Sequence, residues 1–286
     1  MATGTNIKTY FDGAWHDADI PVMRAGDHGA WQATQVFDGA RYVNGLAPDL
    51  RAHCERVVRS ARALSLHPGK TGAEIFDIVW EGLKRYPKDT PVYIRPNFFG
   101  IDGGHYGIVP AETEAGFFVC LEEVPIAPPE ASSRLTTTRF HRPVLATAVL
   151  DAKAGCLYPN NARMLMEARS KGYDNALVTD AMGNVAETAT ANIFMVRDGV
   201  VFTPIPNGTF LAGITRARHI ANMKADGMEV VEAVLTFADF EAADEVFLSG
   251  NMNKITPVTA FEDTSYQAGP VTSRVRDLYW DWALSA

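Results

Sequence analysis

Hydrophobic spacing divides the first part of the chain into two helices and several strands. Apolar residues three and four positions apart predict helices at residues 49–66 and 72–86. Extended apolar runs predict strands at 92–99 and 116–121. The pair Asn44-Gly45 predicts a tight hairpin turn after residue 43, because both residues accept left-handed backbone. This part is therefore expected to place helices on a sheet.

The second part of the chain alternates between helical and extended patterns. Gly172 and Gly227 each follow a helical pattern and suit its C-terminal cap, where the backbone is left-handed. Asp198-Gly199 separates two apolar runs and predicts a hairpin. The expected helices lie at residues 161–171, 215–225 and 271–284, and the expected strands at 176–179, 193–196, 200–203, 228–233 and 245–248.

A proline-rich stretch between these parts marks the expected domain boundary. Residues 122–133 contain Pro125, Pro128 and Pro129 and few side chains that could join a core. We therefore expect an α+β protein of two domains, with an N-terminal domain at residues 1–121, a linker at 122–133 and a C-terminal domain at 134–286.

The composition narrows the class of protein without indicating a function. Of 286 residues, 47% are hydrophobic and 21% are charged, which is ordinary for a globular protein. A formal net charge of −8 disfavours nucleic acid as a partner, and no apolar run is long enough for a membrane span. The N-terminal residues lack a signal-peptide pattern, and three widely spaced cysteines indicate no disulfide framework, so we expect a cytoplasmic protein. Seven scattered histidines give no reason to expect a metal.

The candidate chemistry lies between residues 152 and 216. Lys153 follows a largely apolar segment and is expected near the end of a buried strand, where a dry pocket makes a lysine amine nucleophilic. Tyr158 offers a phenol at the start of a helix. Glu187 stands among small and apolar residues, and a buried carboxylate there needs a partner. Gly213-Ile214-Thr215 precedes a helical pattern, and backbone N–H groups at a helix start suit a phosphate.

Each of these features also has an ordinary explanation. Lysines and glutamates are mostly solvated, a tyrosine often lies in a core, and threonine is a common helix cap. Arg56, on the predicted helix 49–66, could offer a guanidinium fork to the same phosphate or could be a solvated arginine. The order of the set, with a lysine, a tyrosine, an acid and an anion-binding turn, favours a site for pyridoxal 5′-phosphate (PLP).

Seven motifs strengthen this interpretation when they are taken together. They are Val36-Phe37-Asp38-Gly39-Ala40-Arg41, Arg51-Ala52-His53-Cys54-Glu55-Arg56, Tyr93-Ile94-Arg95-Pro96, Ala152-Lys153 with Tyr158, Glu187 with Asn192-Ile193-Phe194, Leu211 with Gly213-Ile214-Thr215-Arg216, and Ala243-Asp244-Glu245-Val246-Phe247. In these motifs the chain resembles the fold-type IV PLP enzymes over nearly its whole length, and most closely the branched-chain aminotransferases. The resemblance implies a two-domain α+β fold and a transaminase.

The resemblance also implies a role for individual residues. Lys153 is expected to form the Schiff base with PLP and to act as catalytic base and acid. Glu187 is expected to pair with the pyridine nitrogen and Tyr158 with O3′. The expected cofactor contacts are Arg56, Tyr158, Glu187, Leu211, Ile214, Thr215 and Asn251, and the expected substrate contacts are Gln32, Phe37, Arg41, Arg95 and Met252.

The chain departs from the family pattern at several of these positions. Asn251 and Met252 replace the threonine and the small residue of the family's G-T-A turn. Gln32 replaces a tyrosine, and Leu157 replaces the asparagine before the site tyrosine. Arg95 is followed by proline, so the R-x-H signature of D-amino-acid enzymes is absent from the sequence. The changes at Gln32 and Met252 bear on substrate choice, whereas Asn251 stands where the family's threonine would touch the cofactor phosphate.

The sequence leaves the substrate open. The favoured reaction transfers an amino group from an L-branched-chain amino acid to 2-oxoglutarate in two half-reactions. An (R)-selective amine transaminase using pyruvate is the alternative, and an aminodeoxychorismate-type lyase or a non-catalytic protein with the same fold is weaker. The glycines of residues 100–107 do not match a dinucleotide-binding G-x-G-x-x-G. The resemblance implies a homodimer with the active site at the subunit interface, reached by the loop 103–106.

Overall fold

Contacts divide the chain into two compact units in the computed structural model, which describes residues 4–285. Unit 1 comprises the chain up to residue 126 together with residues 151–156. Unit 2 comprises residues 127–150 and the chain from residue 157 onward. No helix within residues 4–285 is both long and apolar enough to cross a lipid bilayer.

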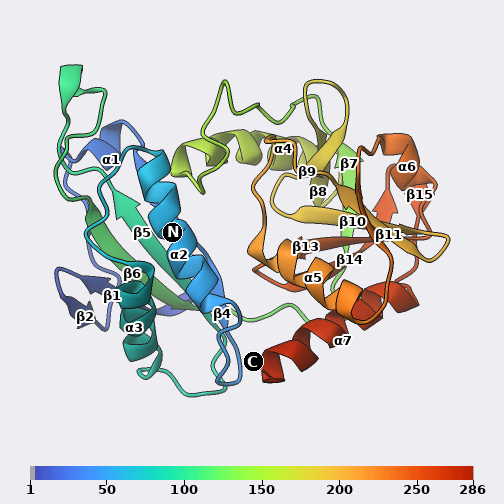
Figure 1. Ribbon diagram of the computed structural model, residues 1–286, viewed down its shortest axis with the longest axis horizontal. Helices are drawn as coiled ribbons and strands as arrows, with labels where there is room; N and C mark the ends of the chain where they lie inside the picture. The colour runs from blue at the N-terminus through green and yellow to red at the C-terminus, as the bar shows by residue number, and fades with distance from the viewer. Residues whose placement is uncertain (1–3, 286) are drawn as a thin grey trace. The chain divides into compact units, whose positions relative to one another are not determined.

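Unit 1 contains a six-stranded antiparallel sheet with two long helices (Figure 1). Its strands are β1 (Thr5–Phe11), β2 (Ala14–His16), β3 (Gln35–Phe37), β4 (Ala40–Tyr42), β5 (Val92–Phe99) and β6 (Gly116–Glu123). Its helices are α1 (His28–Trp31), α2 (Leu50–Ala63), α3 (Gly72–Leu83) and the short 3₁₀ turn η1 (His105–Gly107). The strand order is β2-β1-β6-β5-β3, and β4 also pairs with β5.

The two long helices of unit 1 follow from their sequences. Leu50, Cys54, Val57 and Ala61 are buried on one stripe of α2, with the spacing of a helix that covers a core. A capping box starts α3, because the Glu74 N–H donates to Thr71 Oγ1 at 3.2 Å and the Thr71 N–H donates to the Glu74 carboxylate at 2.7 Å.

Unit 2 is built on a nine-stranded mixed sheet. Its strands are β7 (Ser133–Thr137), β8 (Asn175–Thr179), β9 (Val185–Thr188), β10 (Asn192–Arg197), β11 (Val200–Pro204), β12 (Val230–Ala233), β13 (Glu245–Gly250), β14 (Lys254–Phe261) and β15 (Thr264–Ser265). Its helices are η2 (Gly155–Leu157), which begins in unit 1, α4 (Tyr158–Ser170), α5 (Ile214–Ala225), α6 (Phe237–Glu241) and α7 (Pro270–Ser285). The strand order is β12-β11-β10-β13-β14-β7-β8-β9, with β15 paired to β14.

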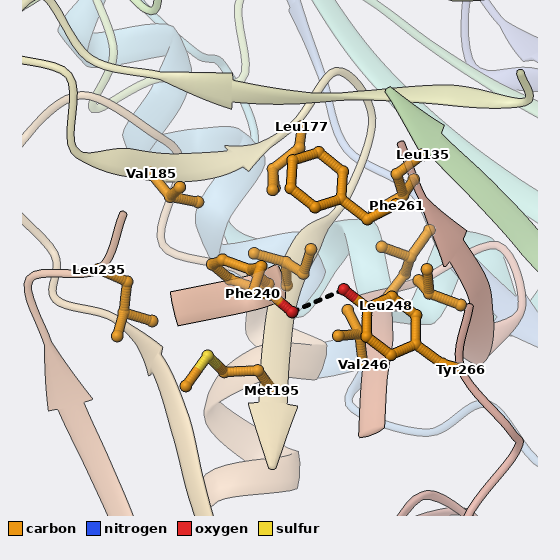
Figure 2. Close-up of a cluster of buried hydrophobic side chains, with 12 residues drawn as sticks. Leu135, Leu177, Val185, Met195, Leu235, Phe240, Val246, Leu248, Phe261 and Tyr266 are labelled. Carbon is orange, nitrogen blue, oxygen red and sulfur yellow. Dashed lines mark hydrogen bonds between the residues drawn. The ribbon is translucent and has the colours of Figure 1, made fainter. Parts of the chain in front are cut away.

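Both faces of this sheet are covered by other elements. Alternate residues of its central strands point to opposite faces and therefore join different buried clusters. On one face, Ile193 and Met195 of β10 join a cluster that Figure 2 draws around Phe240 and Tyr266. The Tyr266 hydroxyl donates to the Phe240 carbonyl at 2.6 Å, which satisfies the buried phenol. Residues of the other parity, with Phe194 among them, pack against α5 and α7.

Most predicted elements are present, and the expected α+β class is confirmed. The turns at Asn44-Gly45 and Asp198-Gly199 have positive φ at both residues, as their hairpins require. Gly172 and Gly227 also have positive φ directly beyond α4 and α5. The expected buried strand before Lys153 is wrong, because the chain there forms turns and bends, and one isolated bridge, Val36 to Ala154, follows the lysine.

The expected domain boundaries stay a prediction, and the contact division refines the picture at one place. Strand β6 ends at Glu123 and β7 begins at Ser133, so the proline-rich residues between them form a connection without regular structure. Residues 151–156, expected in the C-terminal domain, belong to unit 1 by their contacts. They belong to unit 1 because their backbone pairs with β3 of that unit.

Candidate functional site

Lys153 is held against the edge strand and the first long helix of unit 1. The Phe37 N–H donates to the Lys153 carbonyl at 3.1 Å, and the Lys153 N–H donates to Ser60 Oγ on α2 at 3.1 Å. The Lys153 ammonium lies 4.8 Å from the centroid of the Phe37 ring. The backbone of Lys153 is therefore fixed on both sides, although no regular strand carries it.

Three of the expected substrate residues of unit 1, Phe37, Arg41 and Arg95, share one face of its sheet. In the β3–β4–β5 register Phe37 pairs with Asn97, and Arg41 pairs with Tyr93. Directly opposite residues lie on the same face, as do residues two apart on one strand, so this face also carries Arg95. Lys153 Nζ, over the Phe37 ring, lies on this face too.

An ion pair holds one arginine of this face, and a hydrogen bond to a backbone carbonyl holds the other. Arg95 Nη1 lies 3.0 Å from Glu122 Oε1, and Arg95 is partly exposed. Arg41 is fully buried and donates from Nη2 to the Val124 carbonyl at 2.6 Å. Burial lowers the pKa of Arg41 to about 10, against the opposing effects of Tyr93 and Glu122, so the guanidinium stays charged at neutral pH. Arg95 is the more accessible of the two.

Arg56 is engaged with a carboxylate that the motif analysis did not single out. Arg56 Nε and Nη2 donate to Asp38 Oδ2 and Oδ1 at 2.7 and 2.8 Å, and His53 Nδ1 lies 2.7 Å from Oδ1. Burial raises the pKa of Asp38, but the charges and hydrogen bonds of Arg56 and His53 outweigh it and hold the pKa well below its usual range. Asp38 thereby fixes the plane of the Arg56 guanidinium.

Glu187 is buried on β9 and lies between two donors of unit 2. Arg142 Nη2 lies 2.7 Å from Glu187 Oε1, and Asn192 Nδ2 donates to Glu187 Oε2 at 3.2 Å. The carboxylate was expected to be buried with a partner, and Arg142 is a partner that the sequence motifs did not include. A carboxylate oriented in this way can accept a further hydrogen bond from a protonated ring nitrogen.

Asn192 connects this carboxylate to the predicted anion-binding turn. Its Nδ2 also donates to the Leu211 carbonyl at 3.3 Å. A Cβ at Gly213 would lie 2.1 Å from Asn192 Oδ1, so glycine is needed for this close approach. Helix α5 begins at Ile214, and Thr215 is buried in its first turn. The N–H groups of a helix start, with a threonine hydroxyl, can hold a phosphate.

A second turn of unit 2, between β13 and β14, carries Asn251 and Met252. Asn251 Nδ2 is buried and has no hydrogen-bond partner among the residues that the structure describes. A buried donor of this kind needs an acceptor, so this turn also suits an anion. Met252 is 40% exposed, and Tyr158, at the start of α4, is 39% exposed. Gln32 is an exposed residue at the end of α1.

The structure therefore gathers the expected residues in two sets. Unit 1 carries Lys153, Arg56, Gln32, Phe37, Arg41 and Arg95, and unit 2 carries Tyr158, Glu187, Leu211, Ile214, Thr215, Asn251 and Met252. Sequence reasoning missed Asp38, Arg142 and the structural role of Asn192. Asp38 and Asn192 stood inside recognised motifs, whereas Arg142 stood in none and had no sequence signal. The orphaned Asn251 amide and the N-terminal end of α5 fit a bound phosphate, and Glu187 fits a pyridine nitrogen.

Comparison with known proteins agrees with this chemistry. The profile of the family "Amino-transferase class IV" matches residues 35–261. A putative branched-chain-amino-acid aminotransferase of Methanocaldococcus jannaschii is 31% identical, over 96% of this chain and 96% of that protein. The branched-chain-amino-acid aminotransferase of Escherichia coli K12 is 31% identical, over 98% of this chain and 94% of that protein.

Solved structures give the same result for the fold and the cofactor. An aminotransferase from Brucella abortus, solved with PLP bound, has 47% identity and a TM-score of 0.95, over 97% of this chain and 99% of that one. A branched-chain aminotransferase of Thermoproteus uzoniensis, solved with norvaline, has 29% identity and a TM-score of 0.87, over 97% and 95% of the two chains. The chain thus belongs to the class IV aminotransferases: it is a transaminase of fold type IV that uses PLP and acts on small-molecule amino donors and keto acids.

Proposed function

We propose that this transaminase moves the amino group of an L-branched-chain amino acid to 2-oxoglutarate and that Lys153 is its catalytic lysine. One observation carries the proposal. The Lys153 amine lies over Phe37 on the sheet face that also bears Tyr93 and Arg95. A lysine amine, aromatic surface and an accessible guanidinium on one face suit an apolar amino acid with a carboxylate. Relatives with the branched-chain name, similar over nearly the full length, support the same substrate class.

The cofactor is assigned to residues of both units. Arg56, held by Asp38, together with Ile214, Thr215 and Asn251 is proposed to bind the phosphate. Glu187 is proposed to bind the pyridine nitrogen and Tyr158 the O3′ oxygen. Leu211, just before the phosphate-binding turn, is proposed to contact the cofactor. The orphaned Asn251 Nδ2 supports the phosphate assignment, because it supplies a donor without an acceptor among residues 4–285.

The residues of the chain have distinct tasks in this reaction. PLP, when bound, supplies a ring that withdraws electrons from the donor's Cα. Lys153 Nζ takes the proton from that Cα and returns it at C4′, as base and then acid. Glu187 keeps the ring nitrogen protonated, and Arg142 and Asn192 orient its carboxylate. Arg95 is proposed to bind substrate carboxylates, with Arg41, Gln32 and Met252 shaping the same pocket. Because donor and acceptor use one site in turn, ping-pong kinetics follow.

Replacement of the lysine tests this assignment. Lys153→Ala should abolish the visible absorbance of lysine-bound PLP and reduce turnover of L-leucine with 2-oxoglutarate to background. Lys224→Ala, on the exposed end of α5, is the matched control and should retain both properties. Normal turnover by Lys153→Ala would overturn the role of Lys153.

A second substrate class is favoured by Met252. Where the family pattern has a small residue, this chain presents a methionine that is 40% exposed, and the apolar side chain suits an amine without a carboxylate. Parallel assays of L-leucine and (R)-1-phenylethylamine, each with pyruvate and 2-oxoglutarate, separate the alternatives. Faster turnover of the amine would replace the branched-chain assignment with an (R)-amine transaminase.

A homodimer with the active site at the subunit interface is part of the proposal. Apolar side chains are exposed near the loop 103–106, with Tyr106 at 86% and Ile108 at 68%, and exposed apolar groups often mark an interface. Light scattering of the purified protein tests this, and a monomer with full activity would contradict it. The three cysteines are free, which fits the reducing cytoplasm that we propose as the location.

A further inference from the structure

Lys254 is a buried lysine whose position needs a physical reason. It begins β14 and is 1% exposed. Its backbone φ is +64°, a value that residues other than glycine rarely adopt. Removing an ammonium from water is costly, so a buried lysine is retained where its charge or its hydrogen bonds serve a purpose. The family motifs found in the sequence give this residue no role.

The contact of Lys254 determines the orientation of Asn251. Lys254 Nζ donates to Asn251 Oδ1 at 2.6 Å. An ammonium has donors alone, so it must face the amide oxygen, and the amide nitrogen Nδ2 must face the other way. That Nδ2 is the buried donor without a hydrogen-bond partner among residues 4–285.

Asn251 lies close to the predicted phosphate turn in unit 2. It follows β13, whose Ser249 pairs with Asn192 of β10. The Asn192 amide in turn contacts the Leu211 carbonyl and leaves no room for a Cβ at Gly213. The Asn251 turn and the start of α5 therefore both lie near Asn192.

A neutral histidine accompanies the lysine. Burial, and next the charge of Lys254, lowers the pKa of His219 on α5 to about 3. The His219 ring lies 5.3 Å from the Tyr279 ring, and Lys254 Nζ lies 5.5 Å from the same Tyr279 centroid. His219 stands one helical turn beyond Thr215, so the charge of Lys254 lies close to the first turns of α5.

We propose that Lys254 is a positioning residue for the cofactor phosphate: by binding Asn251 Oδ1 it turns Nδ2 toward the phosphate and places a positive charge behind this contact. The inference rests on the proposed function, in which Asn251 and Thr215 bind that phosphate. An asparagine, unlike the threonine of the family pattern, can present either an oxygen or an NH₂ group to an anion. The oxygen would repel a phosphate, and Lys254 prevents that orientation.

Two probes test the role without relying on turnover. Inorganic phosphate added to the PLP-free protein should raise its melting temperature, and PLP titration should give an apparent Kd. Lys254→Met should abolish most of the phosphate-induced shift and raise the Kd for PLP by about tenfold or more, corresponding to one lost charge-assisted contact. Lys224→Met removes the same charge from an exposed site of α5 and should leave both values unchanged. Equal values in Lys254→Met and wild type would overturn the inference.

Variants of Asn251 separate positioning from a direct charge effect. Asn251→Leu removes the amide, and adding Lys254→Met to it should weaken PLP binding little further. A full additional loss would show that Lys254 acts on the phosphate without Asn251, which would overturn the positioning role. Asn251→Asp should weaken phosphate and PLP binding more than Asn251→Leu, because a carboxylate satisfies Lys254 and repels the anion. This comparison holds even if Lys254→Met fails to fold.

The two proposals fail in different ways. Loss of the proposed function would appear as wild-type protein that neither binds PLP through Lys153 nor transaminates. Wild-type protein that does both, beside Lys254→Met with unchanged affinity for phosphate and PLP, would overturn the role of Lys254 alone.

Discussion

Arg142 and Glu187 form a buried ion pair in unit 2, with Arg142 Nη2 2.7 Å from Glu187 Oε1. Arg142 also donates to Asn161 Oδ1 at 2.8 Å and to the Thr209 carbonyl at 3.3 Å. These contacts fix the guanidinium to α4 and to the segment before α5. The guanidinium in turn fixes the position of the Glu187 carboxylate. The carboxylate proposed to meet the pyridine nitrogen is therefore oriented by the protein before any ring is present.

This pair makes the PLP-free protein sensitive to Arg142. Arg142→Met should lower the free energy of unfolding of the PLP-free protein by about 3 kcal/mol, because it leaves a buried carboxylate without its cation. PLP should then stabilise the variant more than the wild type, since a protonated ring nitrogen supplies a new partner. Adding Glu187→Gln should recover part of the loss without PLP. Urea unfolding with and without PLP measures both effects, and equal PLP stabilisation in Arg142→Met and wild type would contradict the expectation.

Asp38 gives a stability difference that depends on pH. Its folded-state pKa is depressed, so its contribution is present above the unfolded pKa of about 3.9 and is lost as pH falls toward the folded value. Asp38→Asn should therefore be less stable than wild type by about 3 kcal/mol near pH 7, with a difference that shrinks below about pH 4. Urea midpoints from pH 3 to 7 measure this. A constant difference across that range would exclude the charged triad of Asp38, Arg56 and His53 as its cause.

His219 should destabilise the protein in mild acid. Its folded pKa of about 3 lies below the unfolded value near 6.5, so the unfolded chain binds a proton first and stability falls as pH drops through this window. Neither ring nitrogen has a hydrogen-bond partner among residues 4–285, so an apolar replacement removes no hydrogen bond there.

The replacement His219→Leu should accordingly be close to neutral at pH 7. At pH 5 it should be more stable than wild type by about 2 kcal/mol, the cost that wild type bears for its unfolded-state protonation. Urea unfolding at the two pH values gives the comparison. His16→Leu, an exposed site on β2, is the control and should show no such gain.

Replacement of Gly39 by alanine should weaken binding of the amino donor and leave binding of the cofactor unchanged. A Cβ at this position would lie 2.2 Å from Tyr93 Oη, so Gly39→Ala must shift the end of the tyrosine ring on the face that carries Arg95. We expect KM for the amino donor to rise by about tenfold, one lost contact in the pocket, while the Kd for PLP stays unchanged. Gly26→Ala is the control and should leave KM unchanged, because a Cβ there would meet no atom within 4 Å and the backbone φ is not positive. A weaker affinity for PLP in Gly39→Ala would place Tyr93 at the cofactor instead.

Local signals predicted the parts of the fold that local physics determines. Asn44-Gly45 and Asp198-Gly199 gave their hairpins because both turns need positive φ. The same signal at Asp12-Gly13, with φ of 49° and 80°, marks the β1–β2 hairpin that went unpredicted. Strand β9 was missed, because its four residues are too short to show a period and are held by pairing with β8.

In the candidate site, too, residues set by local sequence could be predicted and residues set by tertiary contacts could not. Motif residues such as Lys153, Glu187 and Thr215 could be named because the chemistry fixes their types and order. Arg142 and Lys254 could not, because their roles depend on contacts with Glu187 and Asn251 that only the folded chain creates. The supposed strand before Lys153 was an error of the same kind, since Leu150 and Ala152 are buried without pairing along a strand.

The return of residues 151–156 to unit 1 has a consequence for how the chain acquires its structure during synthesis. Strand β3 ends the order β2-β1-β6-β5-β3, and residues 153 and 154 cover its otherwise open side through the Phe37–Lys153 hydrogen bond and the Val36–Ala154 bridge. Until the ribosome has released residue 154, this open side can pair with other chains. The segment that bears Lys153 thus covers an edge of β3 that would otherwise be open to pairing with a strand of another chain.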